Sequence, residues 1–266
     1  EFRATLAPWI DSLPADVVQG HAFFRIGPHE AWLDTGVHLE PGDTVTLLSV
    51  GRVYFSRILD IWVGPSLRLW CRVGDGNPVF RGSRDTLTFT ATGSGRLLLA
   101  SRFPSEWLDP TGHQEAAAPE FAGASGDLSV LAVLWARQAD VQGLFRRFSK
   151  EARVPGLVLA EAERLEQAGP PPPLWQHDWR IGANEVFASA PAPHGRHGIA
   201  CCTRGDVGIL QRDARVPLAP GTRLQWRWRV QQLPSDLAED TMPSHDYLSI
   251  AVEFDDGQDV TYFWSA

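Results

Sequence analysis

Short apolar runs separated by turn-forming residues dominate the chain between residues 31 and 135. Within residues 86–91, apolar and polar side chains alternate, as in a β-strand that buries one of its faces. Residues 96–101 form a second run of this kind after the glycine-rich turn at 93–95, so we predict a hairpin here. Repeated short strands at this spacing favour a β-sandwich over a parallel α/β sheet.

Helical spacing replaces this pattern between residues 140 and 169. One apolar series begins at Val141 and a second follows Pro155, and each is spaced to lie on one face of a helix. The prolines at 170–173 come next, and neither a helix nor a central strand can continue through them. We predict two helices followed by an extended spacer.

The β-type pattern returns after residue 174. Residues 224–230 alternate between apolar and polar side chains and form the strongest predicted strand of the chain. Residues 247–254 and 260–264 are apolar runs on either side of a turn rich in Asp, which predicts a further hairpin. Because no turn or cap follows the last run, we expect sequence to be missing at the C-terminal end.

These patterns together predict an all-β protein with two β-sandwich domains joined by a short helical segment. We place an N-terminal extension at 1–30 and the first sandwich at 31–135. The helical segment and proline linker then occupy 136–173, and the second, incomplete sandwich occupies 174–266.

Charge and composition exclude several classes of partner. The chain of 266 residues has a formal net charge of −8 and its arginines are scattered, so we expect no nucleic-acid partner. No apolar run reaches the roughly 20 residues of a membrane-spanning helix, so we expect no transmembrane segment. Three cysteines, of which Cys201 and Cys202 are adjacent and predicted to be buried, favour a reduced, cytoplasmic chain without a signal peptide.

Searches for catalytic motifs assign no residue to catalysis. The eight histidines are spread without the spacing of a zinc site, and no serine lies in a nucleophile elbow. Phosphate-binding and dinucleotide-binding glycine patterns are also missing from the sequence. We therefore expect no metal and no cofactor, and favour a protein that is not an enzyme.

The first predicted sandwich resembles a known family. The similarity is carried by residues 34–36, 39–46 and 51–55 and by the stretch from Gly82 through the turn at 93–95 to residues 126–130. In these turns and strands the region of residues 31–135 resembles the bacterial galactophilic PA-I-type lectins. The resemblance implies a jelly-roll or galactose-binding-like β-sandwich.

Calcium binding is the property of those lectins that this chain is expected to lack. The resemblance implies a calcium ion held by an early-strand carbonyl, here near Tyr54 or Phe55, and by a late loop carrying Asp, Thr and Asn. Residues 101–104 and 122–125 stand in place of that loop and include Arg102 but no Asp or Asn. Because calcium requires many oxygen ligands and a guanidinium repels it, we expect the fold without the metal.

The C-terminal region resembles a second family, the bacterial domain of unknown function 3047. The resemblance rests on residues 226–230, on the loop that ends in His245, Asp246 and Tyr247, and on the strands at 250–254 and 260–264. It implies architecture and no activity. His245 and Asp246 are candidates for an acid and base pair, whereas the alternative is that Asp246 accepts backbone hydrogen bonds in its loop.

Eleven tryptophans are the unusual feature of the composition. We predict that Trp70, Trp226 and Trp228 lie in the core. An exposed indole in the lectin-like region would stack on the apolar face of a sugar while Arg or Asp side chains bind its hydroxyls. The polar residues around Trp107 are compatible with both exposure and burial. The predicted ligand-binding residues are Tyr54, Asp60, Trp62, Arg102, Trp107 and Ser125.

The sequence thus favours a non-catalytic, lectin-like protein that binds carbohydrate, or another small polar ligand, with a degenerate calcium site. One alternative is a protein-interaction or assembly module that has lost sugar binding and contacts a protein partner or a second copy of itself. Another is a hydrolase whose active site lies in the missing C-terminal sequence. Dependence of glycan binding on calcium separates the first two.

Overall fold

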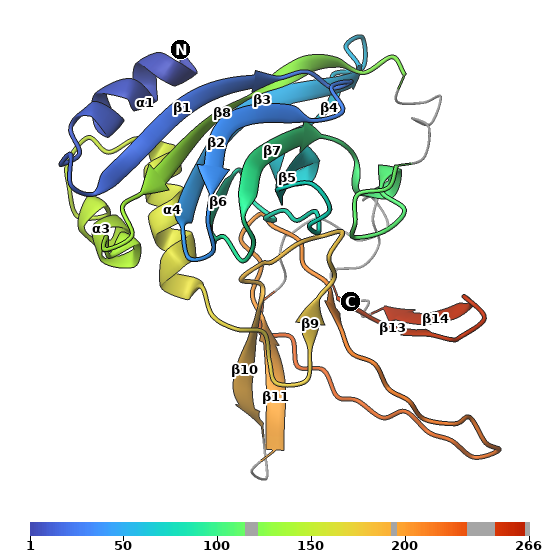
Figure 1. Cartoon of the computed structure of the whole chain (residues 1–266). Coiled ribbons are helices and arrows are strands. Elements are labelled where there is room, and N and C mark those ends of the chain that lie inside the picture. The colour runs from blue at the N-terminus through green and yellow to red at the C-terminus, as the bar shows by residue number, and fades with distance from the viewer. Residues whose placement is uncertain (115–121, 193–195, 233–247, 264–266) are drawn as a thin grey trace. The chain divides into compact units, whose positions relative to one another are not determined.

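The computed structural model describes residues 1–114, 122–192, 196–232 and 248–263. The chain divides into two compact units, Glu1–Asp213 and Ala214–Ala266. Antiparallel strands dominate the first unit and form the regular structure described in the second, so the predicted all-β class is confirmed (Figure 1). No helix in the described ranges is long and apolar enough to cross a bilayer.

Strands and a few helices make up the first unit. The strands of the larger part are β1 (Val18–Ile26), β2 (Leu33–Leu39), β3 (Thr44–Ser56), β4 (Ile61–Val63), β5 (Leu69–Val73), β6 (Thr86–Thr90), β7 (Gly95–Ser101) and β8 (Ser125–Trp135). The later, shorter strands are β9 (Gln176–His177), β10 (Phe187–Ala192), β11 (Arg196–Cys201) and β12 (Leu210–Gln211). The helices are α1 (Phe2–Asp11), α2 (Pro65–Arg68), α3 (Val141–Phe148) and α4 (Gly156–Gln167), with a 3-10 turn η1 (Pro104–Glu106).

Two antiparallel sheets form a β-sandwich in the first unit. The larger sheet has the order β1-β8-β3-β4, with β6 also paired to β3, and the smaller sheet has the order β2-β7-β5. Alternate residues of both sheets point into a common core, where Leu47, Leu99 and Leu128 are fully buried. The sandwich predicted from the alternating runs is therefore present.

Helices cover part of the outer face of the larger sheet. A second core forms where α1, α3 and α4 pack on this face, and it includes Leu6 of α1, Phe145 of α3 and Val158 of α4. These side chains lie against Leu131 and Trp135 of β8. Both helices predicted between residues 140 and 169 are confirmed, and α3 begins where the Asp140 carboxylate accepts the Gly143 N–H at 2.9 Å.

The predicted hairpin at residues 86–101 is wrong. β6 pairs with β3 in the larger sheet, whereas β7 pairs with β2 and β5 in the smaller one, so the turn carries the chain across the sandwich. Gly95 has a φ of +137°, and a Cβ on it would lie 2.5 Å from the Gly74 Cα. The glycines are thus needed for a close crossing between sheets and not for a hairpin turn.

The N-terminal extension takes part in the sandwich. α1 packs on the larger sheet, and β1 pairs with β8 along most of its length. Residues 174–213 also belong to the first unit, since Ala183 forms a parallel bridge with Gly82 and Asp206 forms a largely buried ion pair with Arg84. The domain limits proposed at 31, 135 and 173 stay predictions.

Cys201 and Cys202 are exposed, so their predicted burial was wrong. β10 and β11 form a ladder of two strands, which covers little of either face. Cys71 of β5 is buried in the sandwich core, and burial raises the pKa of its thiol. All three thiols are free.

The second unit contains the predicted C-terminal hairpin, formed by β13 (Ser249–Glu253) and β14 (Asp259–Phe263). Residues 224–230 do not form a strand, contrary to the prediction, because no described segment pairs with them. Trp226 and Trp228 are half-buried rather than core residues, and the Trp226 ring lies 4.7 Å from that of Tyr262. None of the described residues of this unit is fully buried.

Candidate functional site

Three of the predicted ligand-binding residues lie in one row across the larger sheet. Tyr54 of β3 pairs directly with Trp62 of β4 on one side and with Ser125 of β8 on the other. Directly opposed residues of antiparallel strands project from the same face of the sheet. The sheet therefore brings together side chains that are far apart in the sequence.

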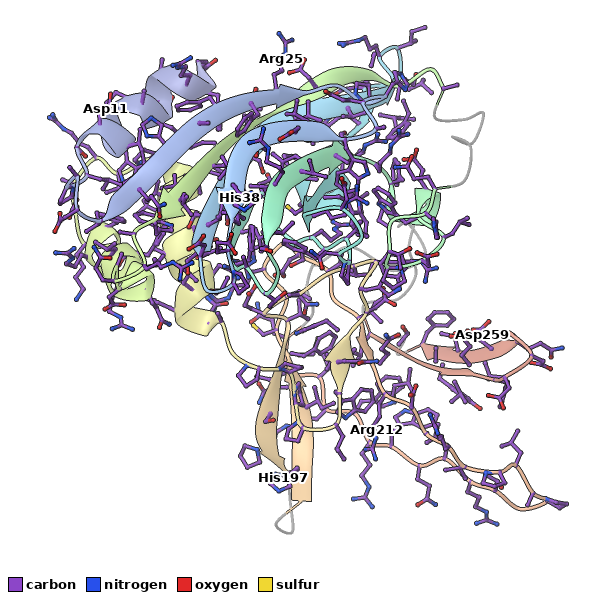
Figure 2. All side chains as sticks on the ribbon, in the orientation of Figure 1. Asp11, Arg25, His38, His197, Arg212 and Asp259 are labelled. Carbon is purple, nitrogen blue, oxygen red and sulfur yellow. The ribbon has the colours of Figure 1, made fainter. Side chains whose placement is uncertain are left out.

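A second row of polar side chains lies beside the first. Arg52 precedes Tyr54 by two positions and so shares its face, and it pairs across the strands with Asp127. The Arg25 guanidinium of β1 donates to the Asp127 carboxylate at 2.6 Å. Figure 2 shows Arg25 pointing away from the sandwich on the same side as α1.

These residues occupy the part of the outer sheet face that the helices leave free. Along β8, Trp135, Val133 and Leu131 are buried under helices, whereas Asp127 and Ser125 on the same face are only partly buried. We call the helix-packed part of this face the covered half. We call the other part the open half, and it consists of Arg25, Arg52, Tyr54, Trp62, Ser125 and Asp127.

Arginine side chains pack on both aromatic rings of the open half. The Arg52 guanidinium lies 4.2 Å from the centre of the Trp62 ring, and that of Arg57 lies 4.4 Å from the Tyr54 ring. Arg57 also donates to the Ser125 hydroxyl at 3.1 Å. Neither Arg52 nor Arg57 has a carboxylate partner in the described part of the chain, so both keep N–H donors for a ligand.

Two glycines allow β3 and β8 to approach closely at the open half. Gly51 has a φ of +136°, and a Cβ on it would lie 2.3 Å from the Asp127 carbonyl oxygen. Gly126 has a φ of +106°, and a Cβ there would lie 2.2 Å from the Arg52 carbonyl oxygen. Any other residue at either position would push the two strands apart, so these glycines fix the spacing between the two rows.

Asp60 lies outside the row, in the turn between β3 and β4. Its φ of +51° is in the left-handed region, which Asp tolerates better than most residues. It is exposed and shares the β3–β4 hairpin with Trp62. Its place in the predicted ligand-binding set stays a prediction.

Arg102 and Trp107 lie in a different environment. Trp107 is only 1% exposed and packs 5.5 Å from Trp70 on the outer face of the smaller sheet. Because the loop folds back over that sheet, with the Trp70 indole N–H donating to the Arg102 carbonyl at 3.1 Å, no face of Trp107 is open to a sugar. The predicted burial of Trp70 is confirmed.

The side chain of Arg102 takes part in the structure of its own loop. It donates to the Glu106 carboxylate at 3.2 Å, and this ion pair is largely buried. Within the described residues, neither Arg102 nor Trp107 makes a hydrogen bond, ion pair or ring contact with Tyr54, Trp62 or Ser125. Phe103 of this loop does approach β3, at 5.0 Å from the Phe55 ring.

A buried arginine joins three elements of the first unit. Arg68 of α2 is 1% exposed and donates to the Ser101 carbonyl at 2.8 Å and to the Pro28 carbonyl at 3.2 Å. Burial lowers the pKa of Arg68 to about 10, although the Glu106 carboxylate acts in the opposite direction. These bonds join α2 to the ends of β1 and β7, so Arg68 has a structural role here.

The donor set of the open half does not fit calcium. The Ser125 hydroxyl oxygen accepts a hydrogen bond from a guanidinium, and a cation bound at that oxygen would be repelled by Arg57. Across the described ranges, no three His, Cys, Asp or Glu side chains lie close enough to share a metal ion. His245 and Asp246, the candidates of the C-terminal region, lie outside the described residues.

Sequence reasoning missed three residues of the open half, namely Arg25, Arg52 and Asp127. The i and i+2 relation of Arg52 to Tyr54 was visible in the sequence and places both on one face of a strand. By contrast, nothing in the sequence shows that β1 lies beside β8, which is what brings Arg25 to Asp127.

Comparisons with known proteins find a family model, which agrees with the resemblance expected for the C-terminal region, and a distant solved structure. A family model described as a protein of unknown function (DUF3047) matches residues 183–266. A solved structure described as "EclA N-terminal domain; PllA-like lectin" has 14% sequence identity, and the match covers 46% of this chain and 99% of that chain with a TM-score of 0.33. No curated protein matches the chain.

Proposed function

We propose that the open half of the larger sheet binds carbohydrate without calcium. The single observation that carries this proposal is the cross-strand row of Trp62, Tyr54 and Ser125 on the uncovered sheet face. Pyranose rings have an apolar C–H face and a rim of hydroxyls, so they are recognised by aromatic surface together with hydrogen-bonding groups. The open half offers both kinds of group on one surface.

Each component has a defined role in this proposal. Trp62, which is 39% exposed, supplies apolar surface for the C–H face of a sugar. Arg52 and Arg57, each held on an aromatic ring, donate to hydroxyl or ring oxygens. Asp127 accepts from sugar hydroxyls, and its ion pair with Arg25 keeps the carboxylate in place.

The site differs from a calcium-dependent lectin site in the source of its positive charge. Two guanidinium groups near the row replace the metal ion as the groups that attract sugar oxygens. A flat, open sheet face buries less of a ligand than a closed pocket does, so we expect weak affinity for single sugars and tighter binding to longer glycans.

A glycan array probed with the intact chain tests the proposal. The wild type should bind a subset of glycans equally in calcium and in EDTA. Trp62→Ala combined with Tyr54→Ala should lower the signal at least tenfold, roughly the loss expected for removing one aromatic stacking contact. The matched control is Phe263→Ala, which removes an aromatic side chain that is 56% exposed in the second unit.

Three outcomes would contradict the proposal. They are the lack of any bound glycan, binding that EDTA abolishes, and binding that the double variant retains while Phe263→Ala loses it. The last result would move the sugar site to the region that matches the DUF3047 model.

A further inference from the structure

The turn between β3 and β4 has an unusual composition. Residues 57–60 connect the two strands, and Ile58 and Leu59 occupy the centre, where Gly, Asn, Asp, Pro or Ser are usual. The turn itself is formed by other groups: the Leu59 N–H donates to the Ser56 hydroxyl at 3.2 Å, and Asp60 adopts the left-handed conformation. The two aliphatic side chains are therefore not required to make the turn.

Apolar side chains of this hairpin are exposed as a group. Ile58 is 95% exposed, Leu59 70%, Ile61 50% and Trp62 39%. Single exposed aliphatic residues are ordinary, but a cluster at a projecting tip is typical of a binding surface. In Figure 1 the turn between β3 and β4 projects as a free loop beyond the strands it joins.

Side-chain types change in order along the hairpin. Ile58 and Leu59 lie at the tip, Ile61 follows, and Trp62 and Tyr54 form the next cross-strand pair. Arg52 lies two residues farther from the tip on β3, and its guanidinium packs on the Trp62 ring. With a rise of about 3.3 Å per residue, the tip lies roughly 10 Å beyond the aromatic pair.

This order matches the layers of a phospholipid bilayer. Aliphatic tips enter the acyl region to a depth of about 5–10 Å, whereas Trp, Tyr and Arg side chains prefer the headgroup level. Arg52 and Arg57 have no carboxylate partner among the described residues and so can contact lipid phosphates. Asp60 is the acidic residue of the turn and opposes this attraction.

The formal net charge of −8 does not exclude binding to anionic lipid phosphates. At physiological ionic strength, charges more than about 8 Å from a surface are largely screened, so the groups nearest the tip dominate. On the hairpin itself, Arg52 and Arg57 stand against Asp60, while Arg25 and Asp127 on the neighbouring strands pair with each other. The local balance therefore favours phosphate groups.

We infer that the β3–β4 hairpin inserts its Ile58 and Leu59 tip into a phospholipid membrane surface, with Arg52 and Arg57 at the phosphates. This docking goes beyond the proposed sugar binding and does not depend on it. Docked in this way, Arg52 and Arg57 contact lipid phosphates with the same guanidinium groups that the proposed sugar site uses, so lipid and glycan compete for them.

Co-sedimentation with sugar-free vesicles tests this inference separately from carbohydrate binding. The probes are vesicles of phosphatidylcholine mixed with phosphatidylglycerol, and vesicles of phosphatidylcholine alone. The wild type should sediment with both and more strongly with the anionic mixture. Ile58→Ser with Leu59→Ser should lower the partition coefficient roughly tenfold to a hundredfold, because two aliphatic side chains lose their contact with lipid.

The matched control is Leu108→Ser with Leu159→Ser, which removes two exposed leucines elsewhere in the first unit. This control should bind vesicles like the wild type, and equal thermal unfolding curves check that both double variants fold. Failure of the wild type to sediment, or equal binding by both double variants, would overturn the inference. So would a wild-type dimer that Ile58→Ser with Leu59→Ser dissociates, because the tip would then be a protein interface.

Discussion

The covered and open halves of the larger sheet share the same strands and the same face but differ in side-chain type. On β3, Leu48 is fully buried under helices, whereas Arg52 further along the same face is exposed. On β8, Leu131 and Trp135 are buried, whereas Asp127 pairs with Arg25 at the surface. One continuous sheet face thus packs against helices at one end and is open to solvent at the other.

This difference shows how the chain separates stability from recognition. Where helices supply a second apolar layer, burial of aliphatic and aromatic side chains stabilises the fold. Where none of the described helices covers the face, aromatic rings are held by cation–π contacts and leave polar groups available. Substitutions in the two halves should therefore change different properties, and their effects test the distinction.

The largest effect is expected from the covered half. Phe145 of α3 is fully buried, and its ring lies 5.9 Å from that of Trp135. Phe145→Ala should lower the free energy of unfolding by about 3–5 kcal/mol, through lost burial and the cavity left behind. Urea denaturation followed by circular dichroism measures this change, and a loss as small as that of an open-half variant would contradict the distinction.

Loss of a buried ion pair should also lower the free energy of unfolding more than loss of an exposed one. Arg164 of α4 donates to Glu161 at 2.7 and 2.8 Å and to Glu185 at 2.6 Å, and all three side chains are nearly buried. Burial acts to lower the pKa of Arg164, but the two carboxylates raise it above its ordinary value. Arg164→Gln should cost about 3 kcal/mol because it leaves two buried carboxylates without their cation.

Arg25→Gln is the control for that variant on the open half. It removes an ion pair of similar length, 2.6 Å, in which the Arg25 side chain is 77% exposed. Its effect on the free energy of unfolding should stay below about 1 kcal/mol. Equal losses for Arg164→Gln and Arg25→Gln would show that burial does not separate the two halves.

A smaller effect is expected from a hydrogen bond under the helices. The Trp135 indole N–H donates to the Thr46 hydroxyl at 2.8 Å, and both groups are buried. Thr46→Val should lower the unfolding free energy by about 1–2 kcal/mol, since the Trp135 indole donor and the Thr88 hydroxyl both lose this partner. Thr44→Val on the same strand removes only an exposed hydroxyl contact of 3.3 Å and should leave the thermal midpoint nearly unchanged.

The smallest effect on stability is expected from the open half itself. Trp62→Ala should change the free energy of unfolding by less than about 1 kcal/mol, because the indole is partly exposed already. The same variant should lower glycan affinity at least tenfold, roughly one stacking contact. A large loss of stability with unchanged glycan binding would place Trp62 in the core and remove it from the site.

Local patterns in the sequence predicted much of the first unit and the hairpin of the second unit. The helices at α3 and α4, the β-type runs and the C-terminal hairpin follow from the spacing of apolar residues along short segments. Tyr54, Trp62 and Ser125 were predicted as ligand-binding residues, and the sheet register brings them together. Their spacing in the sequence alone does not reveal that register.

The errors concern properties that depend on distant segments. The alternation in residues 224–230 was correct as a pattern, but a strand also needs a hydrogen-bonded neighbour. The glycine turn at 93–95 has the composition of a hairpin, yet β6 and β7 find their partners in different sheets. For Trp107 the sequence left exposure and burial open; the residue is buried, because its loop folds over Trp70.

Mapping of backbone amide shifts by nuclear magnetic resonance tests the central claim most directly. Galactose, glucuronate and N-acetylglucosamine would be added in turn to the isotope-labelled chain. At least one sugar should shift the amides of residues 23–25, 50–56, 61–63 and 125–129, which form the open half and its flanks, and leave those of α1, α3 and α4 unchanged. Shifts that lie in other parts of the chain, or no shift with any of the three sugars, would contradict carbohydrate binding by the open half.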